Sequence, residues 1–294
     1  MKEKIVYLVN PISGKLSKKK KINVIYNIDP STKPEIIFSK SAEDADKKAQ
    51  DFMSKNYLVV ACGGDGFINI IAQKAIDYAC NMAILPFGRG NDFARSLDLD
   101  TLEKAIDAIR GRKFKSVRYL NVVFSGNSRI SLTNAGVGLL SEASFRASRI
   151  PLLKGSLLYA SAALISFINL KSHKYVVTTE SQKMEMNNLI LAGAASEYTG
   201  GGMYIAPDAK KFRDKLNLLF AKKLSRLQAV QLLIKVFSGK HIFHHAVTNT
   251  HVRSVKIESL TSDVWSSIVS GDGEYLGKLP VTIHLGKKVL KIAY

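Results

Sequence analysis

One segment near residue 60 does most to limit how this chain can fold. The apolar run Tyr57–Ala61 leads into Cys62-Gly63-Gly64-Asp65-Gly66, and a helical pattern of apolar residues follows as far as Ile76. This order predicts a buried strand, a glycine turn and a helix N-terminus. Glycine lets backbone N–H groups approach a phosphate closely, and the helix dipole favours its charge. Because Asp65 would repel a bare phosphate, the turn favours Mg²⁺-nucleotide binding, with a glycine turn that binds nothing as the alternative.

Two more strand ends carry similar loops. The apolar strand expected at 4–9 breaks into a small-residue loop at 10–15, and the strand expected at 82–85 ends in a glycine loop that carries Asn91 and Asp92. The first loop contains Gly-Lys but lacks the GxxxxGK[ST] spacing of a P-loop, so we exclude that motif. Three such loops at successive strand ends predict an open α/β sheet with a ligand site at the carboxyl ends of its strands.

The pattern of elements divides the chain into two domains. Up to residue 118, strands and helices alternate, which predicts an α/β domain with an open parallel sheet and helices on both faces. Its strands are expected at 4–9, 34–38, 57–61 and 82–85, and its helices from about 18 and at 42–54, 68–80 and 101–110. Residues 119–294 predict a mainly antiparallel, β-sandwich-like domain. Its strands are expected at 117–124, 128–134, 174–181, 187–193, 217–221, 252–258, 264–269 and 280–285, and its helices at 138–148, 156–169 and 224–237.

The chain is strongly basic, with 43 Lys+Arg against 24 Asp+Glu and a net charge of +19. This excess implies a polyanionic partner such as nucleic acid, an anionic membrane or a phosphate substrate, and Lys18–Lys21 could serve any of these or be a solvated helix start. We expect no nucleic acid, because no zinc-finger spacing or RRM-type motif is legible. The longest apolar stretch, 157–168, is shorter than the ~20 residues of a membrane span. With no signal-peptide pattern and two cysteines expected as buried thiols, Cys62 and Cys80, we predict a soluble cytoplasmic protein.

Six motifs follow one another along nearly the whole chain. They are NPxSG at 10–14, GGDGxxN at 63–69, PxGxGNDFAR at 86–95, GGGM…PxA at 200–209, GKH with a basic strand at 239–257, and DGE at 272–274. In this order they resemble the catalytic domain of the diacylglycerol kinase and sphingosine kinase family, and the soluble bacterial lipid kinases look closest. The resemblance implies ATP and Mg²⁺ as cofactors. It also implies a nucleotide-binding domain at 1–118, a lipid-substrate domain with the catalytic carboxylate at 119–294, and an active site in the cleft between the domains.

The resemblance also assigns site residues. Positions that match ATP contacts in the family are Asn10, Pro11, Ser13, Gly14, Ser39, Gly63, Gly64, Asp65, Gly66, Asn69, Arg89, Gly90 and Asn91. Ser39 is the weakest match, because the family tends to have Thr there and a cap or turn serine explains it equally well. The catalytic candidates are Asp65, Asp272 and Glu274, and Glu274 matches the family's proposed proton acceptor. Asp-Gly is also a strong signal for a plain β-turn, which is the alternative at this motif.

Three positions depart from the family pattern. Phe67 replaces the threonine of GGDGT, and Arg89 replaces a small Ser or Thr. Because Arg can bind phosphate bidentately, we expect Phe67 and Arg89 together to form an altered phosphate-binding site. Arg213 stands where the family has an acid linked to a structural Mg²⁺. We expect its guanidinium to replace that ion by pairing with a nearby carboxylate. Whether these departures abolish activity is left open, as is any metal-ligand set.

Three histidines lie close together in the sequence, and the chain has a single tryptophan. His241, His244 and His245 lack a nearby Cys or carboxylate, so we expect a surface or supporting cluster in preference to a metal site. Trp265 lies in a strand pattern and is expected in the core.

The leading hypothesis is an ATP-dependent lipid kinase that phosphorylates a hydroxyl of diacylglycerol or a similar lipid. A catalytically impaired nucleotide- or lipid-binding relative is the alternative. An NAD kinase, which shares GGDG, ranks last because that family's Asn-Glu motif has no convincing counterpart here. We expect a cytoplasmic protein that associates reversibly with an anionic membrane surface carrying the lipid. A homodimer is left open.

Overall fold

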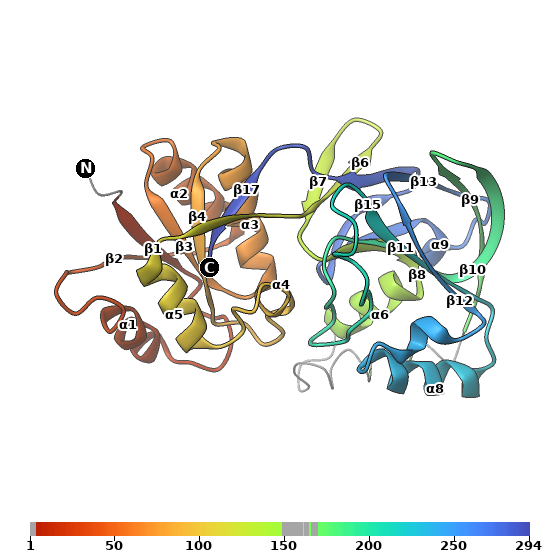
Figure 1. The fold of residues 1–294 in the computed structure, drawn as a ribbon, viewed down its shortest axis with the longest axis horizontal. Helices are drawn as coiled ribbons and strands as arrows, with labels where there is room; N and C mark the ends of the chain where they lie inside the picture. The colour runs from red at the N-terminus through yellow and green to blue at the C-terminus, as the bar shows by residue number, and fades with distance from the viewer. Residues whose placement is uncertain (1–3, 149–160, 162–164, 166–169) are drawn as a thin grey trace. The chain divides into compact units, whose positions relative to one another are not determined.

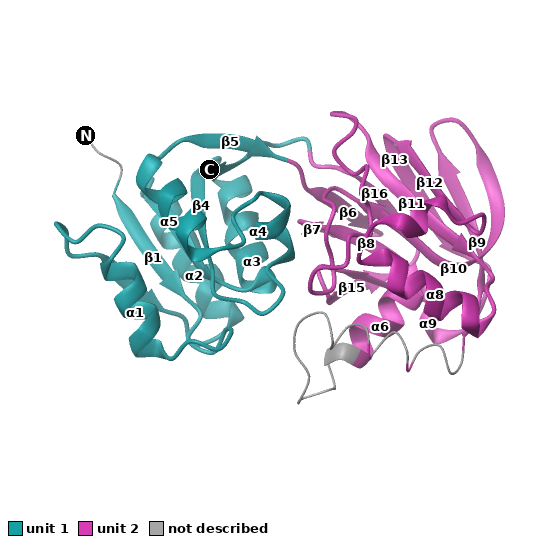
Figure 2. Ribbon diagram, turned by 60° about the horizontal axis from the view of Figure 1, so that its bottom comes forward, with its two compact units in different colours: residues 1–117, 287–294 teal, residues 118–286 magenta. Residues whose placement is uncertain are grey.

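The computed structural model describes residues 4–148, 161, 165 and 170–294. The chain divides into two compact units, one of residues 1–117 and 287–294 and the other of residues 118–286 (Figure 2). The backbone therefore passes from the first unit into the second and returns. We had expected the second domain to run to residue 294, but residues 287–294 belong to the first unit, because they supply a strand of its sheet.

The first unit is built on a six-stranded sheet in the order β2-β1-β3-β4-β17-β5. Neighbouring strands pair in parallel except β17 and β5, so the predicted open parallel sheet is confirmed. In chain order the elements are β1 (Ile5–Val9), α1 (Lys18–Tyr26), β2 (Glu35–Phe38), α2 (Ala42–Met53), β3 (Leu58–Gly63), α3 (Asp65–Asp77), β4 (Asn81–Pro86), α4 (Asp92–Ser96), α5 (Leu102–Gly111), β5 (Phe114–Val117) and β17 (Leu290–Ala293).

Helices cover both faces of this sheet (Figure 1). α2 and α3 pack against each other on one face, and α1 and α5 lie on the other. There the Arg110 guanidinium of α5 donates to the carbonyl oxygens of Asn27 and Ile28, just beyond α1, at 2.9 and 2.8 Å. All six residues of β3 are buried, because this strand lies in the interior of the sheet. Its sequence is therefore a continuous apolar run instead of an alternating one.

The second unit is an antiparallel sheet that folds around one main apolar core, as the predicted sandwich-like domain requires. Long strand β10 (Lys183–Ala194) pairs with β9 through its first half and lies between β8 and β11 through its second half. The other elements are β6 (Leu120–Phe124), β7 (Ser128–Ser131), β8 (Asn134–Gly138), α6 (Leu139–Ser148), β9 (His173–Thr179), β11 (Leu216–Lys222), α8 (Arg226–Val236), η2 (Lys240–Phe243), β12 (Val247–Val252), β13 (Ser254–Ser259), α9 (Val264–Ser267), β14 (Ile268–Gly271), β15 (Glu274–Lys278) and β16 (Val281–Leu285).

The expected strand at 264–269 is wrong over its first part. Val264–Ser267 form the short helix α9, and β14 begins only at Ile268. Asp263 starts the helix by accepting a hydrogen bond from the Trp265 backbone N–H at 2.9 Å, which is a helix N-cap. Trp265 is consequently half-buried on this helix, edge-on to Phe145 with ring centroids 5.1 Å apart, and not a core residue of a strand.

Two other expectations concern the membrane and the thiols. The expected helix at 156–169 and the apolar stretch at 157–168 lie outside the described residues, apart from Ser161 and Ile165. None of the helices in the described part of the chain is long and apolar enough to cross a membrane. Cys62 and Cys80 are buried thiols, as expected.

Candidate functional site

Three loops pack backbone against backbone at the carboxyl ends of β1, β3 and β4. Asn10 donates its backbone N–H to the Cys62 carbonyl at 3.0 Å, which ties the first loop to β3. Gly14 has φ +66°, and a Cβ there would lie 1.8 Å from the Phe87 carbonyl oxygen. A Cβ on Gly88 would lie 2.5 Å from the Cα of Gly64. The glycines of these motifs are therefore needed so that the loops can meet, whatever ligand they bind.

Asp65 links the second loop to the third. It is the first residue of α3, and its Oδ1 accepts a hydrogen bond from the Phe93 backbone N–H at 3.1 Å, in the first turn of α4. A carboxylate at the start of a helix is stabilised by the unpaired N–H groups there. The side chain thus lies at the meeting point of the loops.

The first loop is held by a buried lysine. Lys21 of α1 is fully buried, and its ammonium donates to the carbonyl oxygens of Asn10 and Pro11 at 2.8 and 3.0 Å and to Ser13 Oγ at 3.2 Å. Burial lowers the pKa of the Lys21 ammonium. Sequence reasoning missed this role because Lys21 ends a run of four lysines. The available signal was its spacing of four residues from Ile25, since these two are the buried residues of α1.

Phe67 and Arg89 do not act together as expected. The Phe67 ring is buried against the backbone of Gly63, where an added Cβ would lie 2.7 Å from the ring. Arg89 is exposed, and its guanidinium makes no hydrogen bond or ion pair with any described residue. Of the proposed pair, only Arg89 remains at the surface of the loops.

The remaining predicted nucleotide contacts lie at the same edge of the first sheet. Ser39 is buried just after β2, and its backbone N–H donates to the Val9 carbonyl at 3.0 Å, as a turn residue would. Asn69 is half-buried on α3, one turn beyond Asp65. Asn91 has φ 53°, and its Oδ1 is buried without a hydrogen-bond partner among the described residues. Such an acceptor can take a donor from a ligand.

A second group of candidates lies in the second unit, in the turn between β14 and β15. Asp272 has φ 52°, and its carboxylate accepts four hydrogen bonds from the end of β7 and the residues after it. The donors are Ser131 Oγ at 2.9 Å, the Leu132 N–H at 2.7 Å, and the N–H and Oγ1 of Thr133 at 2.8 and 2.6 Å. Both carboxylate oxygens are engaged. Asp272 therefore holds the turn on that loop.

Glu274 differs from Asp272, although only one residue separates them. It is the first residue of β15 and is exposed. Partial desolvation and, secondarily, the negative charge of Asp272 raise the pKa of the Glu274 carboxyl, which Arg129 partly offsets. A carboxylate with a raised pKa accepts a proton more readily, so Glu274 has the properties of a general base.

The expectation for Arg213 is wrong. Arg213 is exposed and pairs with no described residue, whereas its neighbour Asp214 forms an exposed ion pair with Arg253 at 3.4 Å. Arg118 holds this loop instead, because its guanidinium donates to the carbonyl oxygens of Phe212, at 2.7 Å, and Lys215. No local pattern points to Arg118, which lies 94 residues from Phe212 in the chain.

The histidines are separated in the structure. His241 is buried, and its Nε2–H donates to the Ile205 carbonyl at 2.9 Å, so this residue is not part of a surface cluster. His244 and His245 stack with ring centroids 4.3 Å apart. Within the described ranges, no group of three or more His, Cys, Asp or Glu side chains is arranged to hold a metal ion.

Comparison with known proteins covers both units. Residues 4–122 match the model of the diacylglycerol kinase catalytic domain, and residues 133–294 match that of the YegS C-terminal NAD kinase beta sandwich-like domain. A diacylglycerol kinase from Staphylococcus haemolyticus is 25% identical over 98% of this chain and 87% of its own length, and one from Staphylococcus saprophyticus is 26% identical over 95% and 92%. The crystal structure of a diacylglycerol kinase from Bacillus anthracis covers 99% of this chain and 97% of its own, with a TM-score of 0.74 at 20% identity, which shows the same fold.

Proposed function

The chain belongs to the diacylglycerol kinase family, and we propose that it transfers the γ-phosphoryl group of ATP to a hydroxyl of diacylglycerol or a similar lipid. The observation that carries this proposal is the contrast between two carboxylates of one turn. Asp272 is engaged by four donors, while Glu274 is exposed and has a raised pKa. Glu274 is therefore the carboxylate of the two that can take a proton from a substrate.

In this proposal the first unit binds ATP. Backbone N–H groups of loops 10–14, 63–66 and 88–91 hold the phosphates, with the N-terminus of α3 beneath them. Arg89, exposed on the third loop, adds a cation. Mg²⁺ is usually held by one or two carboxylates plus phosphates and water, so Asp65 fits as its protein ligand without a dedicated metal cluster. The ion would neutralise charge on the phosphates.

The second unit supplies the base. The lipid hydroxyl oxygen forms a bond to the γ-phosphorus as the bond from that phosphorus to the β,γ-bridging oxygen breaks, and the hydroxyl proton passes to the Glu274 carboxylate. Asp272 raises the proton affinity of Glu274 and fixes the turn on the 131–133 loop. We therefore treat Asp272 as a positioning residue, a narrower role than the catalytic one first expected.

The charge of the chain supports a membrane-bound acceptor. A net charge of +19 favours an anionic surface, to which each nearby Lys or Arg contributes ~1 kcal/mol. A catalytically impaired relative is the second candidate, because the inward-packed Phe67 ring replaces the threonine hydroxyl of the family.

The test is phosphorylation by the purified chain with labelled ATP and Mg²⁺. The acceptors are diacylglycerol, monoacylglycerol and sphingosine in anionic vesicles, with NAD as a non-lipid acceptor. We expect label in a lipid, a loss of roughly 10²–10⁴-fold in turnover for Glu274→Gln, and no loss for Glu185→Gln, an exposed strand glutamate of the same unit. ATP binding without any labelled product would favour the impaired relative, and labelled NAD would favour an NAD kinase. If Glu274→Gln turned over at the wild-type rate, Glu274 would not be the general base.

A further inference from the structure

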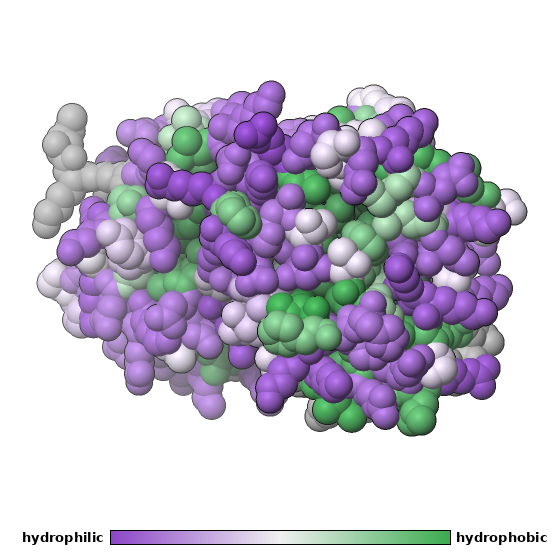
Figure 3. All heavy atoms as spheres, turned by 45° about the vertical axis from the view of Figure 1, so that its right-hand side comes forward, coloured by the Kyte–Doolittle hydropathy of each residue, from purple (hydrophilic) through white to green (hydrophobic). Residues whose placement is uncertain are grey.

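The outer face of helix α8 exposes large apolar side chains. Leu227 and Ile234 are 69% and 70% exposed, and they lie about two turns apart, on the same side of the helix. Phe237 follows the last residue of α8, and Phe243 of the adjacent η2 is 83% exposed. Figure 3 shows apolar side chains between hydrophilic ones along the lower edge of the view, the height at which α8 runs in Figure 1. We call these four residues the α8 face, and exposed apolar surface of this kind marks a contact with a partner or a membrane.

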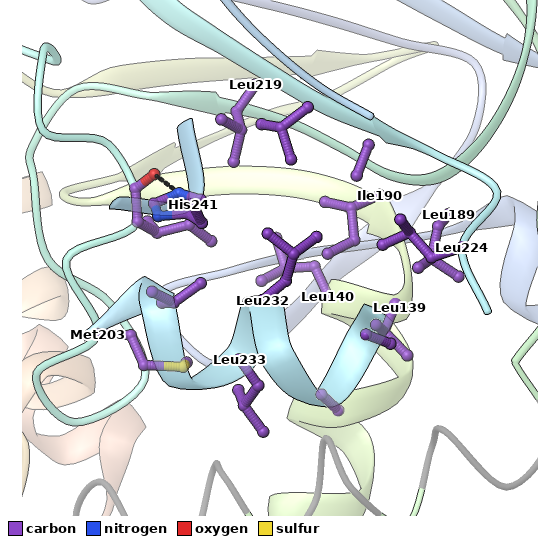
Figure 4. A pocket seen from close by; sticks show the side chains of 16 residues that line it. Leu139, Leu140, Leu189, Ile190, Met203, Leu219, Leu224, Leu232, Leu233 and His241 are labelled. Atoms are coloured by element: carbon purple, nitrogen blue, oxygen red, sulfur yellow. Dashed lines mark hydrogen bonds between the residues drawn. The ribbon is translucent and has the colours of Figure 1, made fainter. Parts of the chain in front are cut away.

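The inner face of α8 already packs on the core of the second unit. Its residue Leu232 is 7% exposed and lines an apolar cavity of about 110 Å³, opposite Leu139 of α6 and Leu219 of β11 (Figure 4). Ala229 lines the same cavity about one turn earlier. A rotation of the helix that buried Ile234 would expose these side chains instead. Folding of the unit therefore accounts for one apolar face of α8 and does not account for the other.

The charge around the α8 face has a single sign. Every charged side chain in residues 215–257 is a lysine or an arginine, because the sequence has no Asp or Glu between Asp214 and Glu258. Those within or next to α8 and η2 are all exposed: Lys222, Lys223, Arg226, Lys235 and Lys240. The excess positive charge of the chain is therefore concentrated around the exposed apolar side chains, with no acid in the segment to offset it.

This combination fits an anionic bilayer better than a protein partner. Lysine is depleted in the cores of protein interfaces, and a second copy of this chain would bring the same positive charges together. At a membrane, the long lysine stems let the ammonium groups reach lipid phosphates while neighbouring apolar side chains insert. Helices with Leu or Phe beside Lys and Arg lie in the plane of the interface, with their apolar side roughly 5–10 Å into the headgroup region.

We infer that the α8 face is the membrane-docking surface of the second unit. Its four apolar side chains insert between the headgroups of an anionic bilayer, and the surrounding Lys and Arg bind lipid phosphates. The inference deepens the proposed function, because it identifies the surface that meets the bilayer carrying the acceptor, but docking requires neither ATP nor turnover. Attachment then has two parts: an apolar part that salt does not weaken, and a charged part that salt screens.

The first experiment is sedimentation of the full chain, without nucleotide, on phosphatidylcholine vesicles containing phosphatidylserine at physiological salt. Replacing both Leu227 and Ile234 by Ser should lower the partition coefficient roughly tenfold or more, because two apolar side chains no longer leave water. Val289→Ser, at a 53% exposed position of the first unit, is the matched control and should not lower it. The replaced side chains are exposed, so the Tm of each variant should stay at the wild-type value.

A pair of lysine variants separates the α8 face from the net charge. Lys235→Gln, on α8, should lower the partition coefficient about fivefold, the equivalent of the ~1 kcal/mol that one basic residue contributes near an anionic surface. Lys183→Gln, at an exposed position of β10, removes the same charge from the same unit and should have a smaller effect. Equal losses in the two variants would show that only the total charge matters.

Insertion itself is measured by fluorescence. Phe243→Trp in a Trp265→Phe background places the single tryptophan of the chain on the α8 face. Its emission should shift to the blue on vesicles and be quenched by lipids brominated near the headgroup. Sedimentation without any quenching would mean adsorption by charge alone and would overturn the insertion.

The remaining outcomes separate this inference from a second copy and from the proposed function. A dimer in sedimentation equilibrium without vesicles, which Ile234→Ser turns into monomers, would assign the α8 face to a second copy and overturn membrane docking. Glu274→Gln should sediment like the wild type. Wild-type protein that docks through this face but phosphorylates no lipid contradicts the kinase proposal alone. Wild-type turnover on vesicle lipid by the Leu227 and Ile234 double variant contradicts the docking surface alone.

Discussion

Three charged side chains each hold one loop of their own unit. Lys21 holds the 10–13 loop, Asp272 holds the 131–133 loop and Arg118 holds the 212–215 loop. Each is charged, and each bonds mainly to backbone groups or hydroxyls of its loop. Removing one of them leaves polar groups of the loop without partners, at a cost of about 1–3 kcal/mol when they are buried. At the scale of the residue, the positions of these loops therefore depend on side chains to which the proposed reaction assigns no chemical step.

Lys21→Met tests this for the 10–13 loop. Methionine has nearly the same length but no donor, so the carbonyls of Asn10 and Pro11 lose the ammonium. We expect the free energy of unfolding to fall by about 1–3 kcal/mol and ATP binding to weaken. Lys20→Met, at the exposed neighbouring position, is the matched control. Urea unfolding and calorimetry measure the two effects, and an ATP affinity equal to that of Lys20→Met would show that Lys21 does not position the loop.

The pH dependence of turnover tests the two carboxylates. Because the pKa of Glu274 is raised, turnover should begin to fall, as the pH is lowered, at a higher pH than an ordinary glutamate would give. Asp272→Asn removes a like charge, so the pKa of Glu274 falls and the acid limb of the kcat profile moves to lower pH. A purely structural effect of Asp272→Asn would lower kcat at every pH without moving the limb.

The raised pKa of Glu274 also predicts an effect on the free energy of unfolding. Its sign is opposite to that for a carboxylate whose pKa is lowered by folding. The folded state holds the Glu274 proton more tightly than the unfolded state, so ionisation of this group costs stability as the pH rises through its folded pKa. Glu274→Gln is therefore not expected to lower the Tm at neutral pH. A clear drop in Tm would show that the ionised carboxylate makes a stabilising contact.

At the scale of the element, the carboxyl-terminal edge of the first sheet is assembled from strand ends that nearly touch. β1, β3 and β4 run in parallel and end together, and their glycine loops fill the space just beyond. The close approach of Gly64 and Gly88 leaves no room for a methyl group. The loops therefore behave as one structure, and a change in one of them displaces the others.

Gly88→Ala should disrupt this edge. Its methyl group would lie 2.5 Å from the Gly64 Cα and the Asn91 Oδ1, so backbone must move, and we expect ATP affinity to fall at least tenfold along with stability. Gly111→Ala, at the end of α5, is the control: no atom lies within 4 Å of its added methyl group, and helix propensity favours alanine by up to about 1 kcal/mol. Equal ATP affinity in the two variants would contradict the packing described here.

The sequence predicted an element correctly where the residues that determine it lie within the element itself or next to it. β1 to α3 were predictable because apolar periodicity, glycines and caps such as Ser41 all lie within each segment. Val264–Ser267 were not, because a stretch as short as Val-Trp-Ser-Ser fits a strand or a short helix, and only the Asp263 cap decides. Arg118 and Arg213 exchanged roles for a related reason: which guanidinium reaches a loop is set by contacts far apart in the chain, which no local pattern records.

At the scale of the whole molecule, the property that matters is the net charge, because it is the sum over many residues. A net charge of +19 should bring the protein to anionic membranes through many weak contributions. We expect sedimentation with phosphatidylserine vesicles at low salt and weaker sedimentation at physiological salt, because the screening length falls from ~30 to ~8 Å. Neutral phosphatidylcholine vesicles are the control, and equal binding to both kinds of vesicle at all salt concentrations would exclude charge as the anchor.

The position of β17 has a consequence for how this protein is made. β17 lies between β4 and β5 but is translated after the whole of residues 118–286. At 5–20 residues per second, the ribosome takes roughly ten to thirty seconds to reach it. During that time β4 is an open edge of the first sheet, and β5 lacks the strand with which it pairs. The first unit is thus completed last, and the growing polypeptide is exposed to mispairing and to chaperones until its final strand leaves the exit tunnel.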